Sequence, residues 1–364
     1  MQRAKNLNIV PFFKRYLFRK KTLTTLFFLL YLAVVSFFLQ SEVVPALTSE
    51  TPLTLYSNQT ANDLKKVTYE TIKKAKTSIT ILIFSLTDSD IIALLKQKIE
   101  EGVDVTIVHD SVATPDLHFR LGPKAKVGKW RGRGLMHHKI IVIDHVDVWF
   151  GSTNLTRESL QLHANLTLGI HSPAFACECE KKALSMLKEK KLSIDPLTIQ
   201  SQGQTIEFFF LPESKNALEK LISCIKSAKK SCKVAIYTFT HPALTQALVE
   251  AHRRGVNVQV VIDNESSRQT SKKAYVRLKR EGVFVAKSKR AGLLHHKLAI
   301  IDDNQLITGS ANWTKAAFQN NDDAIAFIAP LNEEQHKKIN ELWKTIIRES
   351  QFTSSSNSVI TEGD

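Results

Sequence analysis

The stretch His137-His-Lys-Ile-Ile-Val-Ile-Asp144 is followed, after a short gap, by Gly151-Ser-Thr-Asn154. The same pattern returns in His295-His-Lys-Leu-Ala-Ile-Ile-Asp302, followed by Gly309-Ser-Ala-Asn312. Both copies read His, any residue, Lys, four apolar residues and Asp, and then Gly-Ser-any-Asn. One such match is a weak signal, but two copies with the same sequel indicate an internal duplication.

The four apolar residues of each copy predict a buried strand. Alternate side chains of a strand share a face, so His137 and Lys139 should point the same way. His295 and Lys297 repeat this arrangement in the second copy. The histidine that follows His137 or His295 points to the opposite face, and we assign it no chemistry.

The remaining polar residues of the motif fall into two groups. Asp144 and Asp302 have the opposite parity, so we expect them to complete the catalytic set as orienting or structural groups. The Gly-Ser-any-Asn sequel precedes an expected helix, for which Thr156 and Thr314 are the predicted N-caps. Because a helix N-terminus favours anions, its polar residues are candidate substrate contacts: Ser152, Asn154, Ser310 and Asn312.

Each copy therefore offers one imidazole, one fixed cation and neutral hydrogen-bond donors, a set that suits a phosphate diester. The cation and the donors would stabilise the extra charge of the transition state. One histidine would attack phosphorus while a second protonates the leaving oxygen. Because each copy supplies a single imidazole, the two copies must face each other across a shared cleft.

The doubled motif resembles the signature of the phospholipase D superfamily over roughly residues 53–349, with a membrane-anchored bacterial type as the nearest likeness. The resemblance implies an α/β fold of two similar lobes, each a mixed sheet flanked by helices, with pseudo-twofold symmetry. It also implies a covalent phosphohistidine intermediate, no metal and no other cofactor.

The resemblance also suggests roles for individual residues. His137 would be the nucleophile and His295 the general acid. Asp323 fits the acidic residue that, in relatives, orients a catalytic histidine. The matching region of the first copy, Asn165-Leu-Thr167, has no carboxylate. The division of labour between the two histidines therefore stays open.

The amino end predicts a membrane segment. The chain has 364 residues and a formal net charge of +15, and residues 1–21 are basic without any acid. Residues 22–39 are free of charge, which is close to the lower limit of about 17 residues for a spanning helix. No small-any-small cleavage site follows, so residues 22–40 predict an uncleaved anchor with the catalytic part on the non-cytoplasmic side. The alternative is a cleaved signal and a secreted protein.

The two lobes share one numbering frame. Asp110 and Asp263 are 153 residues apart, whereas His137 and His295 are 158 apart. The difference of five residues falls in Ser111–Gly134, which we predict to be a loop-rich insert lining the cleft. We expect lobes at 51–195 and 203–350, a linker at Asp195–Gln204 and a disordered tail at 351–364.

The insert carries cations around one aromatic residue, Trp130. They are Lys124, Lys126, Lys129, Arg131 and Arg133, and the second lobe offers Arg277, Lys279, Arg280, Lys287, Lys289 and Arg290. This composition suits a nucleic-acid backbone with base stacking on Trp130. It equally suits anionic lipid headgroups, or a solvated basic loop without a ligand.

We predict a phosphodiesterase that hydrolyses a phospholipid head-group diester at a phospholipid membrane. Three alternatives remain: a metal-independent endonuclease on the same scaffold, a phosphatidyl transferase of the cardiolipin synthase type, and a non-catalytic binder of anionic lipid or nucleic acid. The nature of the product would separate the lipid hydrolase, the endonuclease and the transferase. The non-catalytic binder would bind without turnover.

Overall fold

The computed structural model describes Phe28 and residues 44–190 and 194–350. Its contacts divide the chain into two units, 1–45 and 46–364, and the second unit contains both motifs. The predicted basic region 1–21, the 22–40 membrane segment apart from Phe28, and the tail 351–364 lie outside the described residues. Among the residues that are described, no helix has the length and apolar character needed to span a bilayer.

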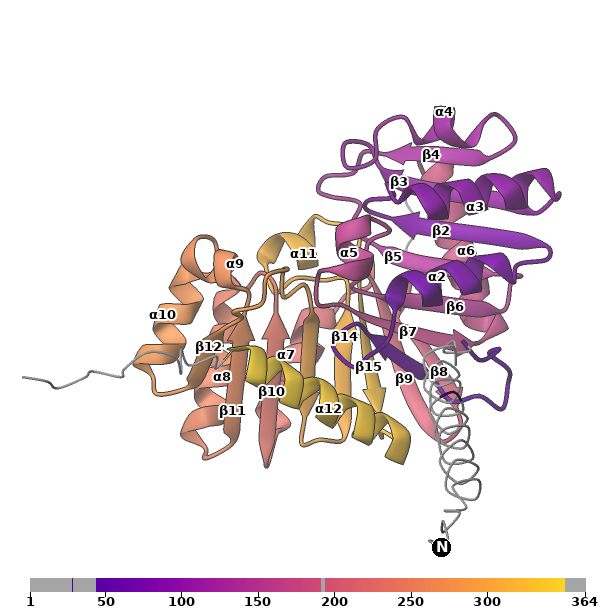
Figure 1. Ribbon diagram of the computed structural model, residues 1–364. Coiled ribbons are helices and arrows are strands. Elements are labelled where there is room, and N and C mark those ends of the chain that lie inside the picture. The colour runs from indigo at the N-terminus through magenta and orange to yellow at the C-terminus, as the bar shows by residue number, and fades with distance from the viewer. Residues whose placement is uncertain (1–27, 29–43, 191–193, 351–364) are drawn as a thin grey trace, which may run out of the picture. The chain divides into compact units, whose positions relative to one another are not determined.

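Two mixed sheets flanked by helices form the second unit (Figure 1). The first sheet has the order β1-β7-β6-β5-β2-β3-β4. Its strands are β1 (Thr54–Ser57), β2 (Ser78–Ile83), β3 (Asp104–Asp110), β4 (Lys126–Trp130), β5 (Lys139–Ile143), β6 (Asp147–Gly151) and β7 (Leu166–His171). The strands β2, β3 and β4 run parallel, and β5 runs antiparallel to β2. The start of β5 therefore lies at the edge where β2 ends.

The second sheet repeats this order as β12-β11-β10-β13-β14-β15-β9, with β8 added at one edge. Its strands are β8 (Leu197–Ser201), β9 (Gln204–Leu211), β10 (Ser231–Ile236), β11 (Asn257–Ile262), β12 (Phe284–Lys287), β13 (Lys297–Ile301), β14 (Gln305–Gly309) and β15 (Asp323–Ala329). Each motif thus supplies the matching strand of its own sheet, β5 or β13. The α/β fold with two similar lobes is confirmed.

The helices follow the same frame. Those of the first lobe are α2 (Leu64–Lys73), α3 (Ser89–Glu100), α4 (Leu117–Leu121), α5 (Arg157–Gln161) and α6 (Pro173–Leu187). Those of the second are α7 (Ala217–Ser227), α8 (Pro242–Arg253), α9 (Asn264–Arg268), α10 (Lys272–Arg280), α11 (Lys315–Gln319) and α12 (Glu333–Ser350). Thr156 caps α5 and Thr314 caps α11, because each hydroxyl accepts a backbone N–H of the first turn.

One hydrophobic core contains side chains of both sheets and of α6 and α12. Phe150 of β6 packs edge-to-face on Phe208 of β9, with ring centroids 5.3 Å apart, and Phe175 of α6 lies 4.6 Å from Phe208. Burying one such side chain contributes about 1.5–3 kcal/mol. The two lobes therefore share one hydrophobic core, and buried side chains hold them together.

Two stretches predicted to lack regular structure contain strands. β4 lies inside the predicted insert Ser111–Gly134 and extends the first sheet beside β3. β8 lies inside the predicted linker Asp195–Gln204 and pairs with β9. Both are edge strands. Pairing with the neighbouring strand, β3 or β9, determines their conformation more than their own residue pattern does. The loop and linker predictions were wrong for these residues.

Candidate active site

Reciprocal backbone bonds bring the starts of β5 and β13 against the opposite lobe. The N–H of His137 donates to the carbonyl oxygen of Asp322 at 2.7 Å, and the N–H of His295 donates to that of Ala164 at 2.9 Å. Each motif histidine thus lies just before its strand and contacts a residue from the other half of the chain. The shared cleft expected from the sequence requires this arrangement.

His137 is held by a carboxylate of the second lobe. Its Nδ1 lies 2.7 Å from Oδ1 of Asp323, a fully buried residue at the start of β15. The hydroxyl of Ser310 donates to the same oxygen at 2.7 Å and fixes its position. Since a carboxylate accepts hydrogen bonds, Nδ1 carries the proton, and Nε2 is left with its lone pair.

His295 is held by a neutral amide of the first lobe. Its Nδ1 lies 2.9 Å from Oδ1 of Asn165, which also accepts the hydroxyl of Ser152 at 2.8 Å. The amide nitrogen of Asn165 donates to the carbonyl oxygen of Ser159 at 2.8 Å, so the amide orientation is fixed. The two histidines therefore share one geometry but have partners of different charge.

The two motif lysines lie on the face predicted from strand parity. Nζ of Lys139 donates to the carbonyl oxygen of His137, and Nζ of Lys297 donates to that of His295, both at 2.7 Å. Both lysines are buried. An ammonium has three donors, so each keeps further N–H groups for a ligand.

An aromatic residue packs on each histidine–lysine pair, and the sequence analysis missed both. The ring of Phe84, directly after β2, lies 5.3 Å from that of His137, and Tyr237, directly after β10, lies 5.2 Å from His295. Phe84 and Tyr237 are 153 residues apart. The repeat frame could therefore have identified them as matched residues at the strand ends that meet the motifs.

A third histidine lies near the second half of the site. The ring of His163 is 6.1 Å from that of His295, and the side chain is partly exposed. The residue 158 positions later is Asn321. Because the repeat has no histidine there, no signal in the sequence singled out His163.

In the site without ligand, burial is the largest cause of the shifted pKa values of the lysines and histidines. It lowers the pKa of Lys139 to about 7 and that of Lys297 well below its usual value. Burial, together with the charges of both lysines, lowers the pKa of His295 well below 6.5. It also lowers the pKa of His137, although Asp323 opposes this. Burial alone would raise the pKa of Asp323, but the charge and hydrogen bond of His137 bring it to about 2.

The motif aspartates do not join the two histidines. The carboxylate of Asp144 accepts the backbone N–H groups of Lys76, Thr77 and Ser78, at the other end of the first sheet. Asp302 does the same for Lys229, Lys230 and Ser231. Asp144 and Asp302 are therefore moved from the candidate catalytic set to a structural role. Each fixes the turn before the strand, β2 or β10, that pairs with its own motif strand.

The serines of the sequel also differ from expectation. Ser152 and Ser310 are fully enclosed and bond the partners of the histidines, so they position other residues instead of facing a substrate. Oδ1 of Asn312 accepts the backbone N–H of Thr238 at 3.3 Å. Oδ1 of Asn154 is buried and has no partner among the described residues. Of the polar residues in the Gly-Ser-any-Asn segments, Asn154 and Asn312 thus remain candidates for contact with a ligand.

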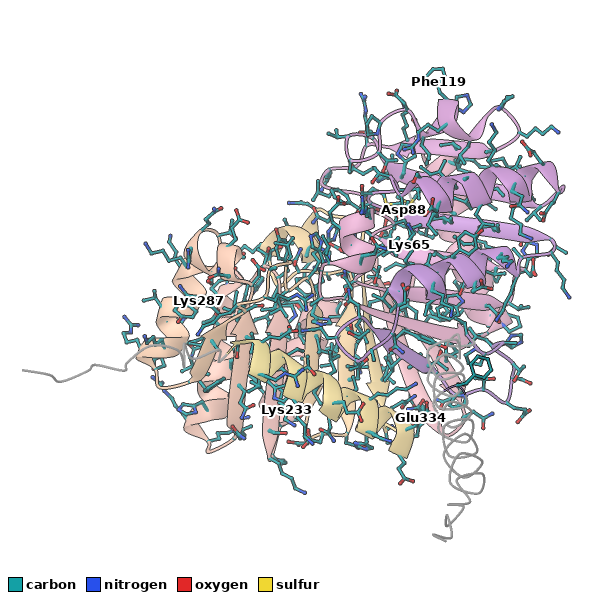
Figure 2. All side chains as sticks on the ribbon, viewed as in Figure 1. Lys65, Asp88, Phe119, Lys233, Lys287 and Glu334 are labelled. Atoms are coloured by element: carbon teal, nitrogen blue, oxygen red, sulfur yellow. The ribbon has the colours of Figure 1, made fainter. Side chains whose placement is uncertain are left out.

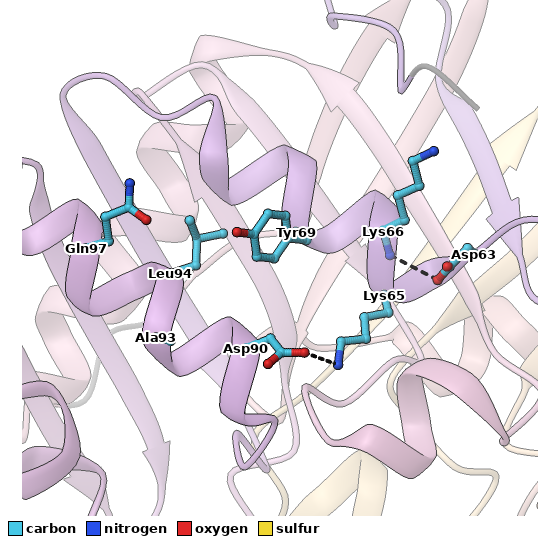
Figure 3. Close-up of a pocket in the computed structure, with 8 residues that line it drawn as sticks. All are labelled: Asp63, Lys65, Lys66, Tyr69, Asp90, Ala93, Leu94 and Gln97. Carbon is cyan, nitrogen blue, oxygen red and sulfur yellow. Dashed lines mark hydrogen bonds and ion pairs between the residues drawn. The ribbon is translucent and has the colours of Figure 1, made fainter. Parts of the chain in front are cut away.

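A groove of about 590 Å³ between α2 and α3 is separate from this constellation (Figure 3). Its charged groups bond one another: Nζ of Lys65 lies 2.7 Å from Asp90 and 3.1 Å from Asp88. Figure 2 labels Lys65 and Asp88 close together on the first lobe. The groove contains none of the residues of the doubled motif.

Comparison with known proteins identifies relatives of the two lobes. A family profile described as "Cardiolipin synthase, PLD-like domain" matches residues 68–187 and 221–346, which is more than half of the chain. The "Mitochondrial cardiolipin hydrolase" of Xenopus laevis is 32% identical over 136 residues, 37% of this chain and 64% of that protein. The "Phospholipase D" of Rickettsia bellii is 34% identical over 104 residues, 29% of this chain and 51% of that protein. The chain thus spans less than two thirds of either relative.

A solved structure of phosphatidylserine synthase from Haemophilus influenzae resembles both lobes together. It superposes with a TM-score of 0.63 over 84% of this chain and 88% of that chain, at 13% sequence identity. At this identity the likeness concerns the fold alone.

Proposed function

The chain belongs to the phospholipase D superfamily, and from that premise we propose that it hydrolyses a phospholipid head-group diester through a covalent phosphohistidine. One observation carries the proposal: two histidines 158 positions apart are each held at Nδ1 by a residue of the opposite lobe. Both Nε2 atoms are thereby free for chemistry at one phosphorus. The names of the relatives, a cardiolipin hydrolase and a phospholipase D, support a phosphoric diester as substrate.

We assign the nucleophile to His137. When its Nε2 bonds to phosphorus, the imidazole gains positive charge, and the carboxylate of Asp323 stabilises that charge through the Nδ1 proton. Asn165 offers His295 the same hydrogen bond without the negative charge. The difference between these two partners supports this assignment.

His295 then serves as general acid and afterwards as base. Burial and the charges of the two lysines lower its pKa in the free site. A bound phosphate anion counters the lysine charges, so substrate binding favours the imidazolium. As the bond from phosphorus to the leaving oxygen breaks, that oxygen takes the proton from Nε2 of His295. In the second step His295 takes a proton from water, the water oxygen bonds to phosphorus, and the bond to His137 breaks.

Lys139, Lys297, Asn154 and Asn312 would bind the non-bridging oxygens. The charge on these oxygens grows in the transition state, and each donor lost from such a site costs about 10²–10³ in rate. We place this chemistry in lobes at 51–195 and 203–350. The 22–40 segment would anchor them to a membrane, which would keep the enzyme at a lipid surface.

Trapping the intermediate tests the proposal. Bis(p-nitrophenyl) phosphate has a leaving group that departs without a proton, so His295→Gln should form the adduct and fail to hydrolyse it. Intact-mass measurement in the presence of a chelator should then show an acid-labile aryl phosphate on His137, and His137→Gln should show none. An adduct on His295 would reverse the assignment, and turnover without any adduct would exclude the mechanism.

A second candidate, an endonuclease, is favoured by one observation: three exposed cations of the insert, Lys129, Arg131 and Arg133, have no ion-pair partner among the described residues. Unpaired cations suit a polyanionic backbone. Incubating the full chain with phospholipid vesicles and with single- and double-stranded DNA and RNA separates the two. Added glycerol distinguishes hydrolysis from transfer, because transfer yields a glycerol ester in place of phosphatidate.

A further inference from the structure

A cavity of about 940 Å³ lies where the end of β4 and the loop after it meet the segment between α11 and β15, and its lining includes Asp322, whose backbone bonds His137. We call it the Trp130 cavity. The first lobe lines it with Lys129–Arg133 and Glu189, and the second lobe lines it with Pro212, Glu213, Gln319, Asn320 and Asp322. It is thus built from both halves of the chain, as the histidine site is.

Two consecutive residues connect the cavity with His137. The side chain of Asp322 lines the cavity and accepts the indole N–H of Trp130 at 2.6 Å. The next residue, Asp323, points the other way and holds Nδ1 of His137. The carbonyl oxygen of Asp322 also accepts the backbone N–H of His137. The cavity is therefore separated from the nucleophile by one segment of backbone.

The floor of the cavity is polar and has a free acceptor. Lys182, 2% exposed, donates to Oε1 of Glu213 at 2.6 Å and to Oδ1 of Asp322 at 3.1 Å. Oε2 of Glu213 is buried and has no partner among the described residues. A buried acceptor without a partner costs free energy, so a ligand hydroxyl that donates to it would be favoured.

The rim of the cavity is positive. Lys129, Arg131 and Arg133 are exposed, and the structure gives none of them an ion pair within its described ranges. Lys126, on the same strand as Lys129, differs because it pairs with Asp104 at 2.6 Å. The rim also holds one exposed acid, Glu189, so it keeps an excess of positive charge and suits a phosphate.

The matched position in the other lobe is filled. Arg290 stands 158 residues after Gly132 and bonds Glu349 of α12 at 3.1 Å. Glu349 accepts Gln59 at 2.5 Å, and Gln59 in turn bonds His296 at 2.6 Å. At Gly132, by contrast, an added Cβ would come within 2.9 Å of the Asp322 carboxylate, so no side chain fits at this position. The room for a substrate that extends beyond the histidines is the Trp130 cavity itself, of about 940 Å³.

We infer that the Trp130 cavity binds a phosphorylated polyol attached to the scissile diester, with its phosphate at the rim cations and a hydroxyl on Oε2 of Glu213. This inference rests on the proposed function, because it names the head-group chemistry of that site. Preferred substrates then have a head group that carries hydroxyl and a second phosphate. A choline head group matches neither the rim nor the floor.

A kinetic experiment on the full chain in vesicles tests the rim. The variant Arg131→Gln/Arg133→Gln should raise KM about tenfold for a lipid whose head glycerol carries a second phosphate. It should leave phosphatidylcholine and bis(p-nitrophenyl) phosphate unchanged. Lys272→Gln/Lys273→Gln, which removes two exposed cations of α10, is the control and should change nothing. Equal losses on all three substrates would overturn the inference.

A binding experiment keeps the cavity testable even without turnover. Glycerol phosphate should change the tryptophan fluorescence of the full chain, and the change should vanish in Trp130→Phe. Glu213→Gln should weaken binding of glycerol phosphate and leave that of inorganic phosphate alone. If the native chain hydrolyses no diester, the proposed function fails while this titration still reports on the cavity. Fluorescence that responds equally in Trp130→Phe would overturn the cavity assignment.

Discussion

At the scale of single residues, the site depends on the difference between Asp323 and Asn165. Both occupy the same place in their repeat, both accept the Nδ1 proton of a histidine, and both are held by a serine hydroxyl. They differ by one atom, oxygen for nitrogen, and this difference is the basis for the different tasks proposed for the two imidazoles.

Asp323→Asn should slow the attack step by 10² or more, because the imidazolium that forms on His137 loses its counter-charge. A comparable change of the aspartate in a serine protease triad costs about 10⁴ in kcat. The rapid release of p-nitrophenol measured in a stopped-flow instrument reports this step directly. Asn165→Asp is the matched control and should keep the rapid phase. A rapid phase that survives Asp323→Asn would show that the carboxylate serves the fold alone.

The pKa of about 7 at Lys139 predicts a pH dependence. A diester keeps one negative charge over the whole range, so it binds best to the protonated lysine. As pH rises above 7 the ammonium loses its proton, and kcat/KM should fall up to tenfold per pH unit. Lys139→Arg should move this limb to higher pH, because a guanidinium stays charged. A flat profile between pH 7 and 9 in the native chain would contradict the prediction.

At the scale of elements, the glycine of each Gly-Ser-any-Asn sequel has a structural cause. Gly151, the last residue of β6, has φ +152°, and a Cβ added there would meet the carbonyl oxygen of Leu166 at 2.2 Å. Gly309 repeats this at the end of β14. The missing side chain lets β6 approach β7 closely enough for Ser152 to bond Asn165.

Gly151→Ala should therefore lower the free energy of unfolding by more than backbone conformation alone explains. Gly102→Ala is the control, since Gly102 also has positive φ, +91°, but meets nothing within 4 Å of an added Cβ. We expect a loss of about 1 kcal/mol for Gly102→Ala and clearly more for Gly151→Ala. Urea denaturation measures both, and equal losses would mean that the collision relaxes.

Elements also show what the sequence could and could not predict. The parity of the motif strands and the caps at Thr156 and Thr314 follow from local pattern, and both are confirmed. The strands β4 and β8 depend on neighbours far along the chain, so local pattern missed them. The pairing of His137 with Asp323 and of His295 with Asn165 crosses between lobes, and no spacing rule reveals which partner reaches which ring.

At the scale of the whole molecule, both histidines and both of their partners belong to one chain and one packed core. His137→Gln and His295→Gln should therefore fail to restore activity when the two purified variants are mixed, because every chain then lacks one imidazole. A diester hydrolysis assay at increasing protein concentration measures this. Recovered activity would show that half-sites from different chains combine, which would replace the single-chain site with an intermolecular one.

Each histidine is hydrogen-bonded by a residue of the opposite lobe, and this has a consequence for the protein during its synthesis. During synthesis the first motif emerges long before Asp323, the residue that secures its imidazole, whereas the second motif emerges after Asn165, the residue that secures its own. We therefore expect a product truncated before Asp323 to be inert toward diesters, because the imidazole of His137 has no carboxylate to hold it. The complete site forms only once the second lobe has been made, so neither half of the chain should act alone.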